Sequence, residues 1–274
     1  RDDRLHERDV RADPVAAERR LMNIPIDFTW LEATSLACVR ITAFLVLAPP
    51  FSHGTIPMRI RAMLGVGLAL AVSPVVTAGY ERLDTGAFML ALAGQALTGA
   101  LLGFLVMVLF SAIQGAGHLV DTFGGFQLAQ AFDPGMAING AQFTRLFQMT
   151  AIMLLFASDG YQLVLGGLFR SFDAVPVTGM IDLAKPAEAL VGAAGQMMLS
   201  AVQIAGPLLI VLFLADVGLG LVSRVAPALN AFAMGFPIKI GLTLLLVGFV
   251  YAALPSVVAV IAEEAARLLL GVTR

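Results

Sequence analysis

Two long runs without a charged residue constrain this chain more than any other feature. They extend over Ala189–Ala215 and Ile240–Ala262. At a rise of about 1.5 Å per residue, a helix over either run can cross a hydrocarbon core of about 30 Å. The stretch between them, Asp216–Lys239, carries charged residues and is interrupted by Pro and Gly. We therefore expect a polar turn between two membrane-length helices.

The composition extends this expectation to the whole chain. Charged residues are 13% of the sequence and apolar residues 59%, whereas soluble domains contain about 25% charged residues. Six apolar segments are separated by turn signals, so the sequence predicts an all-α polytopic membrane protein with about six long hydrophobic helices in hairpins. The segments are Glu32–Phe51, Ala62–Ala78, Gly86–Ile113, Phe143–Phe169, Ala189–Ala215 and Ile240–Ala262.

Several functional classes find no support in the residues. A net charge of −2 with only two lysines gives no basic field for nucleic acid. One cysteine, Cys38, and three scattered histidines do not suggest a metal centre, and we expect no cofactor. The sequence also lacks a serine elbow and a His-Glu-x-x-His motif, so we do not expect an enzyme. A secondary transporter or an ion channel remains open as a class for such a membrane protein.

Small residues within the third apolar segment predict close helix packing. Gly99 and Gly103 are spaced by four residues, which lets another backbone approach the helix closely. On its own this signal is weak, because glycine is common in membrane helices.

The connection Asp121–Gly140 is unusually apolar for a loop. Four glycines make its backbone permissive, while Phe and Met side chains replace the polar groups of an ordinary loop. Non-helical backbone at membrane depth is tolerated only inside protein or along a cavity. Two interpretations are therefore open: an apolar seal across a pore, or a re-entrant segment buried against a neighbour.

Three charges interrupt apolar runs, namely Arg40, Arg145 and Asp159. Because burying a charge at membrane depth is costly, each is expected to have a partner. We expect Asp159 to pair with Arg145 or with another chain. A proton relay is less favoured, since no series of titratable groups follows one helix face.

Residues 1–21 differ from the rest of the sequence. They hold six of the 17 basic and six of the 19 acidic residues, which is typical of a disordered tail. The tail is either a charged arm or sequence upstream of a true start at Met22, and we favour the second interpretation.

Four motifs, in this order, resemble the family of the flagellar biosynthetic protein FliR and its injectisome counterpart SctT. The resemblance covers about residues 22–262. The motifs are QLAQAFDP (127–134), LLFASDG (154–160), RSFDAVPVTG (170–179) and the segment from Gly220 to Lys239 with Arg224, Pro227, Asn230, Phe232, Phe236 and Pro237.

The resemblance implies a subunit of the type III export gate in the bacterial inner membrane, in the flagellar basal body. It implies P, Q and B subunits (FliP, FliQ and FlhB-like proteins) and unfolded protein substrates as partners, without a catalytic role. Residues 22–188 would be P-like and 189–274 a Q-like hairpin. The pore plug would include Phe123, Phe126, Leu128, Phe132 and Met136. The loop that contacts partner subunits would include Arg224, Pro227, Asn230, Phe232, Phe236, Pro237 and Lys239.

Overall fold

The described part of the chain is built only from α-helices. The computed structural model describes residues 27–54, 56–127, 142–179, 184–226 and 231–273. Five of its helices are long and apolar enough to cross a membrane, and a sixth span results if α6 and α7 count as one bent span. The predicted all-α, polytopic membrane fold is thereby confirmed. Residues 1–21 lie outside the described residues.

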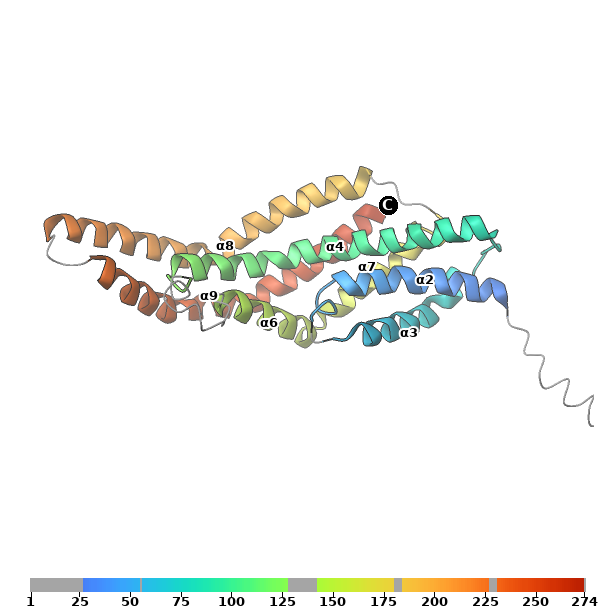
Figure 1. The fold of residues 1–274 in the computed structure, drawn as a ribbon, viewed down its shortest axis with the longest axis horizontal. Coiled ribbons are helices and arrows are strands. Elements are labelled where there is room, and N and C mark those ends of the chain that lie inside the picture. The colour runs from blue at the N-terminus through green and yellow to red at the C-terminus, as the bar shows by residue number, and fades with distance from the viewer. Residues whose placement is uncertain (1–26, 55, 128–141, 180–183, 227–230, 274) are drawn as a thin grey trace, which may run out of the picture.

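The spine of the molecule is α4, Thr85–Phe123, which runs along most of its length (Figure 1). The Asp84 carboxylate begins the helix by accepting hydrogen bonds from the N–H groups of Gly86 and Ala87. On its sides α4 contacts α2, α6, α8 and α9. Four of the other described helices therefore pack directly on this helix.

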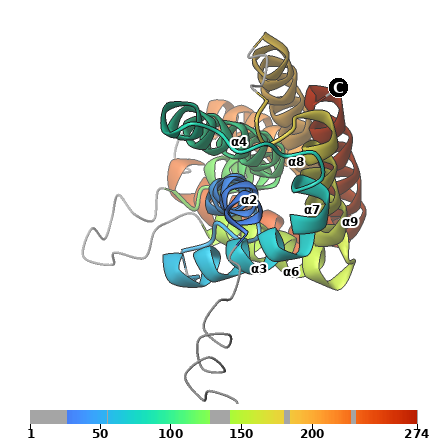
Figure 2. The ribbon, with the colours of Figure 1, turned by 90° about the vertical axis from the view of Figure 1, so that its right-hand side faces the viewer.

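A hairpin of α2 (Phe28–Leu47) and α3 (Met58–Val76) packs on one half of the spine. In the end-on view α2 lies between α4 and α3 (Figure 2). Glycine makes this contact possible: a methyl group on Gly99 would overlap the carbonyl oxygen of Arg40, and one on Gly103 would lie 2.8 Å from the carbonyl oxygen of Phe44. The close approach predicted for these two glycines is confirmed, and its partner is α2 of the same chain.

The fourth apolar segment is two helices. α6 (Gln142–Ala157) and α7 (Gly160–Ala174) meet at an angle of 76°. Asp159 takes a left-handed backbone conformation at the break, with φ +56°, which Asp tolerates better than most residues. The prediction of one helix over Phe143–Phe169 was wrong because apolar composition does not report a local break of two residues.

The last two helices are much longer than their uncharged runs. α8 (Ala184–Val225) and α9 (Ala231–Thr273) have 42 and 43 residues, so each extends about 63 Å, twice the hydrocarbon thickness. The predicted turn over Asp216–Lys239 was therefore wrong for most of its length. Gly235 and Pro237 lie inside α9, and proline is tolerated in membrane helices because neighbouring groups satisfy the freed carbonyl.

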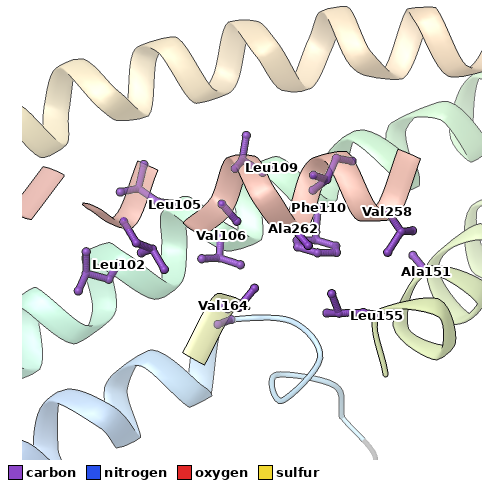
Figure 3. Packing of buried hydrophobic residues seen from close by; sticks show 14 of the residues in the cluster. Leu102, Leu105, Val106, Leu109, Phe110, Ala151, Leu155, Val164, Val258 and Ala262 are labelled. Carbon is purple, nitrogen blue, oxygen red and sulfur yellow. The ribbon is translucent and has the colours of Figure 1, made fainter. Parts of the chain in front are cut away.

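The core lies where α4 meets α6 and α9. Figure 3 shows Leu102, Val106 and Phe110 of α4 beside Ala262 of α9 and Leu155 of α6. All five side chains are buried. α8 contacts α4 and α9, and α9 also contacts α7. The last hairpin therefore packs against both α4 and α7.

Large apolar side chains also cover the outside of the described helices. Many of them are more than half exposed. Such a surface is unsuited to water and fits hydrocarbon or protein partners. Examples are Met63, Met89, Val191, Met198, Phe213, Leu245 and Phe249.

Candidate functional site

The connection from α4 to α6 is fixed at its base by one carboxylate. Asp121 is fully buried near the end of α4. Its Oδ1 accepts a hydrogen bond from the N–H of Phe143 at 2.9 Å, and its Oδ2 accepts from the N–H and the hydroxyl of Thr144 at 2.9 and 2.8 Å. These donors belong to the first turn of α6, whose N-terminus favours negative charge. Asp121 therefore joins the two ends of the apolar segment.

Two glycines let the backbones meet at this base. A methyl group on Gly117 would lie 2.6 Å from the Cα of Thr144, so α6 can start against α4 only because this side chain is absent. Gly125, with φ +83°, turns the chain out of α4. The space beside Gly125 is occupied by the ring of Phe236, to which a Cβ would approach within 3.2 Å.

The contact between Gly125 and Phe236 joins the two regions singled out in the sequence. Phe236 belongs to the predicted partner loop and now lies in α9. Gly125 adjoins Phe126, whose ring packs edge-to-face on Phe143 with centroids 5.1 Å apart. The start of the apolar segment is therefore packed between α6 and α9.

The predicted plug residues are only partly visible. Phe123 ends α4 and is 42% exposed, whereas Phe126 is half-buried. Leu128, Phe132 and Met136 lie outside the described residues. The structure therefore describes the base of the predicted plug.

The predicted partner loop is largely helical. Arg224 is exposed in the last turn of α8, and Pro237 is exposed inside α9. Phe232 also lies in α9, but its side chain is outside the described part of the chain. Pro227 and Asn230 lie outside the described residues altogether. Lys239 forms an ion pair with Asp216 of α8, with Nζ 2.6 Å from Oδ2. The lysine thus has a partner within its own hairpin.

Arg40, like Asp121, is a fully buried charged residue. Its guanidinium donates to the Gln95 side-chain oxygen at 2.6 Å and to the backbone oxygens of Ser171 and Val175 at 3.0 and 2.7 Å. It also lies over the Phe172 ring, 4.3 Å from the centroid. The arginine therefore meets the negative end of the α7 dipole and an aromatic face in place of a carboxylate.

The other two interrupting charges are exposed. Asp159 accepts a hydrogen bond from the side-chain amide of Gln162 at 3.2 Å. Within the described residues no ion pair joins Asp159 to Arg145, so the expected internal pairing is wrong.

Sequence reasoning missed two positioning residues, Asp121 and Gln95. Asp121 lies in the apolar connection Asp121–Gly140, shortly before Gly124 and Gly125. An acidic residue at this place in an apolar segment could have marked it as a buried anchor. Gln95, which is buried and binds Arg40 and the Val177 oxygen, is a polar residue inside a long apolar run.

The sequence of this chain is similar to those of known proteins. Residues 31–265 match the family described as bacterial export proteins, family 1. The chain is 29% identical to the flagellar biosynthetic protein FliR of Pectobacterium carotovorum over 82% of this chain and 87% of that protein. It is 31% identical to the Yop proteins translocation protein T of Yersinia pestis, over 77% and 83%. It is also 26% identical to the secretion system apparatus protein SsaT of Salmonella typhimurium, over 81% and 89%.

Proposed function

The chain belongs to family 1 of the bacterial export proteins, and we propose that it forms, with P and Q subunits, a gated pore for unfolded export substrates. One observation carries the functional conclusion: the family match spans residues 31–265, nearly all of the chain. The protein is a component of the type III export apparatus, and it is embedded in a bacterial membrane. In this machinery its role is structural, and we propose no catalytic step.

The partners we propose are the P, Q and B subunits of the same gate. Apolar side chains along α8 and α9 are exposed over much of both helices, as expected for faces that other helices cover. A groove of about 580 Å³ also lies between these helices beside Pro207, Leu208 and Phe249. We propose residues 22–188 as the P-like part and 189–274 as the Q-like hairpin that stacks against Q.

The pore plug is proposed for the segment that Asp121 anchors. Bulky uncharged side chains in a constriction exclude water and offer ions no coordinating oxygen. The buried carboxylate of Asp121 joins the residues that precede this segment to those that follow it. Phe123 and Phe126 begin this segment, and we assign it to the closed state of the gate.

We propose that the protein lies in the bacterial inner membrane, as part of a flagellar basal body.

Deleting the gene should abolish secretion of export substrates, and the intact chain supplied in trans should restore it. The full chain should also copurify with P and Q subunits when the three are produced together. Normal secretion without the gene would contradict the proposal, as would a stable monomer that binds neither subunit.

A further inference from the structure

The turn between α2 and α3 forms a partly polar cleft with α4 and α6, close to the α6–α7 break. The α2–α3 turn and the α6–α7 break are joined by an edge-to-face contact of Phe51 with Phe156, with centroids 6.5 Å apart. Arg61 fixes the turn by donating to the carbonyl oxygens of Ser52 and His53 at 3.0 and 2.8 Å. Beside this junction lies a cleft of about 230 Å³.

The cleft contains two glutamine amides without partners. Gln114 reaches it from α4 and Gln148 from α6. Among the described residues neither side-chain amide forms a hydrogen bond. Both side chains are half-buried, so their amides are accessible from the cleft. These two amides can therefore bind a polar ligand.

The chemistry of the lining selects the kind of ligand. The described residues that line the cleft include no Asp, Glu, Lys or Arg, and His53 is their one titratable side chain. A phosphate group would require cations, and a metal ion such as Ca²⁺ or Mg²⁺ would require carboxylates. A glutamine amide offers one carbonyl acceptor and two N–H donors, which match the acceptor and donor of a peptide unit.

We propose that Gln114 and Gln148 bind the peptide backbone of an extended polypeptide during export. This inference rests on the proposed function, in which an unfolded chain passes through the gate. Every residue of an extended chain presents an N–H and a C=O group, whatever its side chain, so uncharged amides can serve many substrates. A transmembrane helix of a partner fits less well, because its backbone groups are already paired with one another.

The experiment is site-specific photocrosslinking in the complete apparatus. A photoreactive amino acid replaces Gln114 or Gln148, and an export substrate is stalled by a folded C-terminal domain. The control position is Met153, which is also on α6 but is 71% exposed. Substrate adducts are expected at both glutamine positions and not at Met153. Adducts only with another subunit, or none, would overturn the inference.

A substitution series provides a second measurement. Gln114→Leu and Gln148→Leu should each lower export per assembled complex about threefold, the effect of losing one modest hydrogen bond. Gln162→Leu removes an exposed amide from α7 and should leave export unchanged. Parental export by the double variant would also overturn the inference. If export did not require the chain at all, the proposed function itself would fail, and the two failures are thus distinguishable.

Discussion

Asp121 and Thr144, 23 residues apart, are joined by two hydrogen bonds at the start of α6. Both bonds end on one carboxylate oxygen, while the other oxygen accepts the N–H of Phe143. The residues between them include the apolar segment we assign to the plug. A single buried side chain therefore fixes the distance between the two ends of that segment.

Replacing this carboxylate should loosen the base of the segment. Asp121→Ala removes the acceptor of the Phe143 and Thr144 N–H groups, so the complex should lose about 1 to 3 kcal/mol of stability. Asp121→Asn keeps one acceptor oxygen and should lose less. Thermal unfolding of the purified complex measures the effect.

Asp84→Ala is the matched control for Asp121→Ala. It removes an exposed cap from the other end of α4, and it should lower stability by about 1 kcal/mol at most. Equal losses in Asp121→Ala and Asp84→Ala would show that burial of Asp121 has no special role.

The Arg40 network yields a second prediction. Arg40→Met removes the donors for Gln95 and for the end of α7, leaving several buried acceptors unpaired, so stability should fall by about 3 kcal/mol or more. Arg40→Lys keeps the charge but cannot reproduce the planar fork of donors, and it should rescue only part of the loss. Arg145→Met, at an exposed site on α6, should change stability little. Full stability of Arg40→Met would contradict the conclusion that Arg40 holds α2, α4 and α7 together.

The fold was predictable wherever it depends on hydropathy. Uncharged runs located the membrane-length helices, and Gly99 and Gly103 marked a close helix contact that the structure contains. The errors arose where one or two residues decide the outcome. The left-handed backbone at Asp159 separates α6 from α7, where one helix was expected. Pro237 lies inside α9, where a turn was expected.

The site was less predictable because its connections are long-range. Nothing near Asp121 in the sequence shows that its partners are Phe143 and Thr144. Lys239 likewise looked like a contact for other subunits, although the antiparallel hairpin brings Asp216 within 2.6 Å. Pairing across a hairpin depends on where each helix ends, and the sequence placed those ends wrongly.

The contact of Gly99 with α2 gives a third prediction. Gly99→Val would force side-chain atoms into the Arg40 carbonyl, so α2 should separate from α4 and the protein should be degraded. Gly94→Val is the matched control, because no atom lies within 4 Å of a Cβ at that position. Steady-state protein levels in cells compare the two variants. Similar levels would mean that the close approach is dispensable.

A fourth prediction concerns Lys239, where a pair within the chain competes with contact to a partner. Lys239→Glu places two carboxylates together and should weaken the α8–α9 hairpin, with less Q subunit copurified. The swapped variant Asp216→Lys with Lys239→Glu restores an ion pair of opposite polarity. Recovery of Q binding in the swap is the expected result. Loss of binding in both variants would instead identify Lys239 as a direct contact for Q.

The last prediction tests the proposed plug. Deleting residues 124–135 should remove the apolar constriction and let water and ions through the gate. Phe126→Ala should give a milder leak, because the ring that packs on Phe143 is lost while the backbone remains. Ion conductance is measured in cells that carry this chain together with the complete set of P and Q subunits. Phe104→Ala, an exposed position on α4, serves as the control. An assembled deletion complex with unchanged conductance would assign the segment to packing and place the gate elsewhere.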